Sequence, residues 1–216
     1  MRRVAVLFQD DTFGRDGLQA VSQALRRRSL EPVGDATFKR NTTAVKRAVL
    51  DLRKARPDAV FIIGPYEPVA EFIRVSRSIE FRPRFLTLSF AGGQALAEEI
   101  GAQGEGVLIT QVVPPYWDGS IPAAKRFMNA MRRHAAGEGP GFVAFEGYIA
   151  GLLVIETLGR LEGTPSREGF LETLRTDAVK GPDGFPLHFS EGHNQGSDAV
   201  FLTTIDRRGQ LVMVGK

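Results

Sequence analysis

The stretch Arg3–Gly17, RVAVLFQDDTFGRDG, decides the fold. It opens with an uninterrupted apolar run over Val4–Phe8, without alternation of apolar and polar residues. Such a run is typical of a parallel strand that is covered on both faces. Asp10 and Asp11 follow, and their side-chain oxygens are suited to cap a helix that begins near Gly14. Because ligands of open parallel sheets bind outside the carboxyl ends of the strands, we expect this loop to form one wall of a ligand cleft.

The same alternation of strand and helix continues to residue 113. Apolar runs predict further strands over Val33–Phe38, Ala59–Ile63, Phe85–Leu88 and Val107–Val113. Helical periodicity predicts a helix over residues 14–28, a second capped by Asn41-Thr42-Thr43, a third near Pro68 and a short one ending at Ile100. This order predicts an α/β fold with a doubly wound, parallel, five-stranded sheet, in which residues 1–113 form one complete domain.

The character of the sequence changes after residue 113. Pro114-Pro115-Tyr116-Trp117 predicts a stiff crossover over 114–120, in which Tyr116 and Trp117 serve either hinge packing or the rim of a ligand site. Helices are expected over 121–134, 142–161 and 166–176, followed by a strand-like tail over 185–214. These helices have no parallel strands of their own to cover, so the second half is expected either to pack on the first domain or to lack its partner.

Composition narrows the class of protein. The 216 residues are 43% apolar and 25% charged, with a formal net charge of +3 and no cysteine, which excludes disulfides and thiolate chemistry. The basic run Arg26-Arg27-Arg28 ends a predicted helix, where cations favour the helix dipole, and no aromatic residues are interleaved with it. We therefore expect no nucleic-acid partner. The apolar stretch Phe142–Ile155 contains Glu146 and is short for a membrane span.

Catalytic and cofactor sites are not expected. Asp10 and Asp11 are adjacent, which favours helix capping over paired catalytic carboxylates. The glycines of the opening stretch lack the spacing of a dinucleotide fingerprint, and no G-x-S-x-G elbow is present. His188 and His193 flank Glu191 in a polar segment that predicts a turn rather than a metal site.

Six segments, taken in order, resemble the type I periplasmic solute-binding proteins of the branched-chain amino acid (Leu/Ile/Val-binding) family. They are VAVLFQDDTFGRDG, PDAVFIIGPYEPVAEFIRVSR, FLTLSFAGG, GEGVLITQVVPPYWD, FVAFEGYIAGLLVIETL and SEGHNQGSDAVFL. The similarity spans essentially the whole chain, and the chain resembles the C-terminal portion of such a protein.

The resemblance implies two α/β lobes that close like a hinge on a small solute. Residues 1–113 would be one whole lobe, 114–120 a crossover, and 121–216 the returning part of the other lobe, with helices and antiparallel strands but without its main sheet. The implied function is the non-catalytic solute-binding component of an ABC-type importer, truncated here, with an ABC permease as partner. The full-length relative would be periplasmic or extracellular. This chain begins without a signal peptide, so we expect it to be cytoplasmic if expressed as written.

The resemblance also implies which residues contact the solute. Phe13, Tyr66 and Ser89 fall at the contact positions of this lobe, with Asp11 and Phe90 beside them. Phe13 stands where many relatives have tyrosine, and Ser89 where amino-acid-binding relatives often have a carboxylate for the ammonium group of the solute. A leucine-like ligand, an aromatic or aliphatic acid, or an amide are all compatible with this set. No cofactor and no metal are implied.

Two further expectations remain open at this level. A sensor or regulatory small-ligand-binding domain of the same fold is the alternative function. The wide apolar stripe of Phe142–Leu161 predicts self-association, so a homodimer through residues 121–216 is expected if the stripe lacks its partner.

Overall fold

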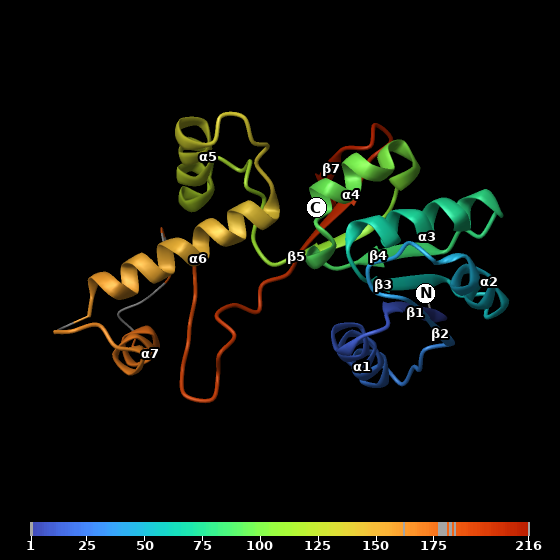
Figure 1. The fold of residues 1–216 in the computed structure, drawn as a ribbon, viewed down its shortest axis with the longest axis horizontal. Coiled ribbons are helices and arrows are strands. Elements are labelled where there is room, and N and C mark those ends of the chain that lie inside the picture. Colours follow the sequence, from blue (N-terminus) through green and yellow to red (C-terminus); the bar gives the residue numbers. More distant parts are fainter. Residues whose placement is uncertain (1, 162, 177–180, 182, 184, 216) are drawn as a thin grey trace. The chain divides into compact units, whose positions relative to one another are not determined.

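The computed structural model of the chain describes residues 2–161, 163–176, 181, 183 and 185–215. The chain divides into two compact units (Figure 1). The first, here called the sheet unit, comprises Met1–Gln111 and Leu202–Lys216, and the second, the helical unit, comprises Val112–Phe201. The interpretation of 1–113 as a ligand-binding lobe, 114–120 as a hinge and 121–216 as the returning part of another lobe stays a prediction.

A single mixed sheet organises the sheet unit. Its strands among the described residues are β1 (Val4–Gln9), β2 (Gly34–Phe38), β3 (Ala59–Ile63), β4 (Arg84–Thr87), β5 (Leu108–Gln111), β6 (Phe201–Ile205) and β7 (Leu211–Met213). They lie in the order β2-β1-β3-β4-β5-β6-β7. The neighbours from β2 to β5 pair in parallel, which confirms the five-stranded parallel core predicted from the sequence.

The tail differs from the expectation. Its two strands, β6 and β7, pair antiparallel with each other and extend this same sheet beyond β5, instead of lying with the helices of the second half. The contacts are specific: the Ile205 amide donates to the Val107 carbonyl at 3.3 Å. The buried Thr203 hydroxyl donates to the Ile109 carbonyl at 3.1 Å, and the buried Gln111 amide donates to that hydroxyl at 3.0 Å. These bonds satisfy polar groups at an edge that β5 alone would leave open.

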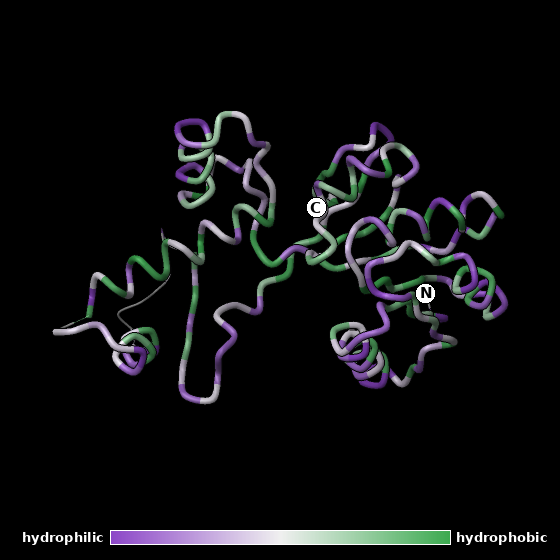
Figure 2. The backbone as a smooth tube through the Cα atoms, in the orientation of Figure 1, coloured by the Kyte–Doolittle hydropathy of each residue, from purple (hydrophilic) through white to green (hydrophobic). Residues whose placement is uncertain are grey.

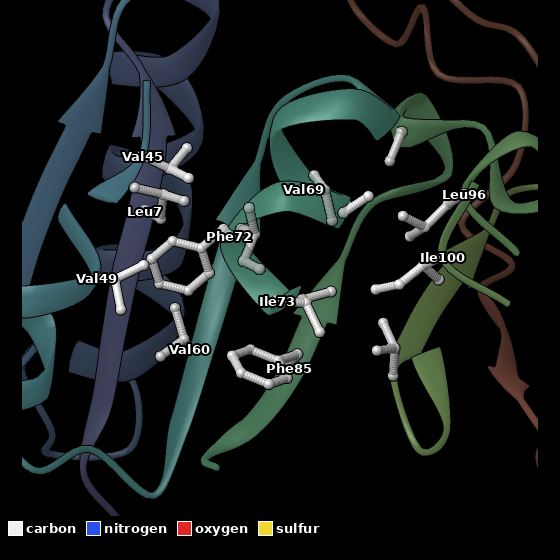
Figure 3. Packing of buried hydrophobic residues seen from close by; sticks show 14 of the residues in the cluster. Leu7, Val45, Val49, Val60, Val69, Phe72, Ile73, Phe85, Leu96 and Ile100 are labelled. Carbon is white, nitrogen blue, oxygen red and sulfur yellow. The ribbon is translucent and has the colours of Figure 1, made fainter. Parts of the chain in front are cut away.

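Helices flank the sheet on both faces. The helices of the sheet unit are α1 (Thr12–Arg26), α2 (Lys46–Lys54), α3 (Tyr66–Ser78) and α4 (Gly93–Ile100), with short 3₁₀ turns η1 (Ser89–Ala91) and η2 (Gly101–Gly104). One hydrophobic cluster lies beneath α2, α3 and α4, and Figure 3 shows Val49, Phe72 and Leu96 of these helices with Leu7 and Val60 of the strands. A second cluster, built on Val6, Phe8 and Ile63, is covered by Leu18 and Val21 of α1. The doubly wound arrangement is therefore confirmed.

On the sheet face that α1 packs against, the strands toward β6 are less completely covered than β1. Every residue of β1 after Val4 is buried, whereas β4, β5 and β6 alternate between buried and more accessible residues. Leu86 and Leu108 are half-buried on the accessible side, and Leu202 is 42% exposed. Alternation of this kind is typical of strands covered on one face only.

The helical unit contains α5 (Pro122–His134), α6 (Phe142–Gly159) and α7 (Arg167–Arg175). Its aromatic residues form a connected packing cluster: Phe127 contacts Phe145, and Tyr116 and Trp117 both contact Phe142, with ring centroids 5.0–5.4 Å apart. Figure 2 shows hydrophobic residues along much of α6. By length and composition alone, the 18 residues of α6 are sufficient to cross a membrane. This property is shared by core helices of soluble proteins. The stretch Phe142–Ile155, considered in the sequence analysis, is shorter and was judged too short for a membrane span.

Candidate functional site

The carboxyl edge of the sheet is the candidate site, and the β1–α1 loop is its most closely specified part. Asp11 is the N-cap of α1: its Oδ1 accepts the Gly14 amide at 3.0 Å. Its Oδ2 accepts the side-chain amide of Gln9 at 2.5 Å. A Cβ at Gly14 would lie 1.9 Å from the Gln9 carbonyl oxygen, so only glycine allows the helix to begin this close to the strand. The predicted capping role of Asp11 is confirmed.

The same contacts fix the charge of Asp11. The Gly14 amide, the Gln9 side chain and the positive charges of Arg40 and Arg15 lower the pKa of its carboxyl below the usual 3.8, although desolvation opposes them. The Arg40 guanidinium lies 3.9 Å from Oδ2, which links the loop after β2 to the loop after β1. Both carboxylate oxygens are therefore engaged within the protein. A direct contact between Asp11 and a ligand stays a prediction.

An aromatic pair joins two loops at this edge. Phe13, in the first turn of α1, and Phe90, in η1 after β4, have ring centroids 4.5 Å apart with an interplanar angle of 44°. Phe13 also packs on the cluster beneath α1, whereas Phe90 is 61% exposed. β3 lies between β1 and β4 in the sheet, so the two loops reach across it. The result is an exposed apolar surface held in place by the buried part of Phe13.

Ser89 stands directly beside this pair. It opens η1, is half-buried, and its carbonyl accepts the Gly92 amide at 2.8 Å. In the described part of the chain its hydroxyl makes no hydrogen bond, so one donor and acceptor group is available next to an aromatic surface. The structure thus brings Phe13 and Phe90 together at this edge, with Ser89 directly preceding Phe90 in η1.

Tyr66 lies on the other side of the sheet edge. It is the first residue of α3 and packs with the cluster beneath α2, α3 and α4, whereas Phe13 packs beneath α1. The cause is topological: the connections after β1 and β3 leave in opposite directions, which makes this the switch point of the sheet. The nearby negative charge of Glu67 is the main reason that the pKa of the Tyr66 hydroxyl is raised. In the described residues Tyr66 shows no ring contact with Phe13 or Phe90.

A pocket beside Tyr66 was not expected from the sequence. It has a volume of about 490 Å³ and is lined by the loop after β2 and by the start of α3 with its N-cap, through Asn41, Thr42, Thr43, Pro65, Glu67 and Pro68. The interpretation of residues 41–43 as a helix cap was wrong. The N-cap of α2 is Val45, without a side-chain cap bond, and the Thr42 hydroxyl instead donates to the Lys39 carbonyl at 2.7 Å. The sequence did contain one indication of this pocket, because both segments directly follow predicted strands, where ligand sites of parallel sheets form.

Tyr116 and Trp117, which the sequence left between packing and a ligand rim, both pack on Phe142 within the helical unit. Their rings also contact each other edge to face, at 4.8 Å. These contacts favour the packing role for both residues.

Comparison with known proteins places this geometry in a family. A family model described as "Periplasmic binding protein" matches residues 1–210. Leu/Ile/Val-binding protein homolog 7 of Brucella abortus (strain 2308) is 20% identical over 219 residues, covering 98% of this chain and 54% of that protein. The chain therefore spans about half the length of the curated relatives it matches.

Comparison with solved structures indicates the same family. A possible leucine/isoleucine/valine-binding protein from Rhodopirellula baltica SH 1 is 29% identical with a TM-score of 0.88, covering 99% of this chain and 59% of that one. A substrate-binding periplasmic protein from Ralstonia solanacearum is 26% identical with a TM-score of 0.85, covering 99% and 61%. The resemblance drawn from the ordered sequence segments is confirmed, and the chain belongs to the periplasmic binding protein family.

Proposed function

We propose that this chain serves in small-solute binding, as the non-catalytic solute-binding component of an ABC-type importer, and that the solute contacts Phe13, Phe90 and Ser89. The observation that carries the proposal is the contact of the half-buried Phe13 with the exposed Phe90, which follows a serine whose hydroxyl makes no hydrogen bond in the described residues, at the carboxyl edge of a parallel sheet. Ligands of such sheets bind at this edge, and an exposed apolar surface there is suited to the apolar part of a solute.

The charges at the edge restrict the class of solute. Asp11 is ionised, but its oxygens are used by Gly14 and Gln9, and Ser89 carries no charge. A zwitterionic amino acid would therefore lack a free carboxylate for its ammonium group, an interaction of about 1.5–3 kcal/mol where it is made. We accordingly include aromatic and aliphatic acids and amides, together with branched-chain amino acids, as candidate solutes.

The remaining parts of the proposal concern the whole protein. The curated relatives are about twice as long as the region that matches this chain. Their names describe Leu/Ile/Val binding. By this analogy we propose an ABC permease as partner and a periplasmic or extracellular location for the full-length protein. Tyr66 and Asp11 belong to the proposed site through the same family analogy.

Titration calorimetry with a panel of branched-chain amino acids, aromatic acids, aliphatic acids and amides at millimolar concentration tests the proposal. We expect saturable binding of at least one class, and Phe90→Ala should weaken it by about tenfold or more because it removes most of the exposed apolar surface. Leu50→Ala is the matched control, since Leu50 is 54% exposed on α2, away from the edge. Absence of saturable binding to every class, or equal affinity in both variants, would overturn it.

A further inference from the structure

The opposite edge of the sheet, where the parallel strands begin, carries a pocket that the proposed solute site does not use. Its volume is about 510 Å³. It lies among the segments that precede β3, β4 and β5 and the last turn of α3. The lining residues are Asp58, Arg77, Arg82, Pro83, Arg84, Phe85, Glu105 and Gly106.

Both carboxylates of this pocket already have partners. Asp58 Oδ2 accepts the backbone amides of Arg2 and Arg3 at 2.8 and 3.0 Å. Glu105 Oε1 accepts the Nε of Arg207, from the turn between β6 and β7, at 2.9 Å. The direct hydrogen bonds of both carboxylates therefore go to groups outside the lining, although the charge of Glu105 also acts on Arg77.

The arginines are less completely paired. Arg82 is held by Glu80, with two hydrogen bonds of 2.9 and 3.0 Å. Arg77 donates through one Nη to the Glu105 carbonyl oxygen at 2.7 Å and is partly buried. The backbone amide of Arg84 donates to the Asp58 carbonyl at 3.0 Å, but its exposed side chain makes no hydrogen bond or ion pair within the described part of the chain. The guanidinium groups of Arg77 and Arg84 thus line one pocket, and neither forms a direct ion pair with a carboxylate in the described residues.

Their environment favours an anion. Burial, and then the positive charge of Arg82, lower the pKa of Arg77, because a cation loses hydration and lies near a like charge, although the negative charge of Glu105 opposes them. An anionic group that accepts from Arg77 would offset the repulsion by Arg82, and Arg84 offers it a second guanidinium in the same pocket. Guanidinium presents its N–H groups in a planar fork that matches the oxygens of phosphate.

We propose that the pocket at the amino edge binds a phosphate group, free or carried on a small ester, through Arg77 and Arg84. The pocket is larger than the anion alone, which leaves space for the remainder of an ester.

Nuclear magnetic resonance of the ¹⁵N-labelled chain, titrated with inorganic phosphate at constant ionic strength, tests the proposal. We expect saturable shifts of the Nε–H signals of Arg77 and Arg84. Arg84→Gln should weaken phosphate binding by about tenfold or more, as expected for loss of a charge-assisted contact. Arg53→Gln is the matched control, because it removes one exposed cation from α2. Arg84 begins an already paired strand and is exposed, so this variant should fold.

Further titrations define the source and class of the anion. Tighter binding of glycerol phosphate than of inorganic phosphate would assign the site to an ester, and the reverse to the free anion. Either result supports the proposal. Linear shifts spread over all arginines, equal phosphate affinity in Arg84→Gln and Arg53→Gln, or acetate binding as tight as phosphate would overturn it.

Discussion

Helices α3 and α6 both carry large apolar side chains, yet they differ in how many of these side chains are buried. The 13 residues of α3 include six buried ones, among them Phe72 and Ile73, which pack over the sheet (Figure 3). The 18 residues of α6 include four buried ones, whereas Val143, Val154, Ile155 and Leu158 are exposed, Ile155 to 67%. The comparison shows that hydrophobicity predicts a requirement for burial, while a packing partner decides whether burial occurs.

The difference has a large energetic consequence. A fully buried aliphatic or aromatic side chain contributes about 1.5–3 kcal/mol relative to an exposed one. For α3 this contribution is realised against β1, β3 and β4, whereas the exposed residues of α6 do not realise it within the helical unit. Removing side chains from the two helices should therefore have very different effects.

The largest effect is expected for Phe72→Ala in α3. Phe72 is completely buried and meets Phe85 edge to face, with centroids 6.1 Å apart. Loss of its ring should lower the free energy of unfolding by about 3–5 kcal/mol. Ile155→Ala in α6 is the comparison variant and should change it by less than about 0.5 kcal/mol at protein concentrations where the chain is monomeric. Urea unfolding followed by circular dichroism measures both, and equal losses would contradict this difference between the helices.

A smaller loss is expected for Gly14→Ala. The new Cβ would meet the Gln9 carbonyl oxygen, so the start of α1 must shift, at a cost of about 1–3 kcal/mol. Gly147→Ala is the matched control, because nothing lies within 4 Å of a Cβ at that position in α6. It should be neutral or stabilise by about 0.5–1 kcal/mol, through helix propensity. Thermal unfolding of both variants checks the pair, and a stabilised Gly14→Ala would show that the close contact is unimportant.

Self-association is the next test of α6. We predict that the chain forms a homodimer through residues 121–216, because the exposed apolar residues of α6 would be covered by a second copy. Ile155→Lys should make the protein monomeric, whereas Leu50→Lys on α2 should leave the dimer intact. Light scattering at micromolar concentration measures the mass. A monomeric wild-type chain would contradict the prediction.

The smallest effect concerns acid stability at the β1–α1 loop. Because the folded-state pKa of Asp11 is below 3.8, its stabilising contribution is present above the unfolded-state pKa and is lost as the pH falls through the folded-state value. Asp11→Asn retains a capping side chain and should flatten the dependence of unfolding on pH in this acidic range. Asp16→Asn, which removes an exposed carboxylate from the same helix, is the control. An unchanged acid profile in Asp11→Asn would contradict the assigned hydrogen bonds.

Local sequence pattern predicted most of the sheet unit. Apolar runs located the five parallel strands to within a few residues, and Asp11 was identified as a cap from its position between a strand and a helix. The cap expected at residues 41–43 was wrong because the same polar side chains can close a loop, as Thr42 does with Lys39. Local pattern cannot distinguish these two hydrogen-bonding choices.

Pairing between segments that are distant in sequence was the main feature that the sequence could not predict. The tail was expected to be strand-like, but its place beside β5 depends on the hydrogen bonds of Thr203 with Gln111 and Ile109, which precede it by 92 and 94 residues. The carboxyl edge was expected to gather the site residues, and Phe13 and Phe90 do meet there. Tyr66 lies on the opposite side because the connections after β1 and β3 lead to opposite sides of the sheet. This feature depends on the order of the strands in the sheet, which local sequence pattern does not give.

The most direct test of the central claim is to map the solute on the chain by amide chemical shifts. With the ¹⁵N-labelled protein and the solute that gives the strongest heat, we predict concerted, saturable shifts at residues 10–14 and 88–93. The signals of α2 should remain unchanged. Shifts confined to other surfaces, or none in these two loops at saturating solute, would contradict a solute site at the Phe13–Phe90 pair.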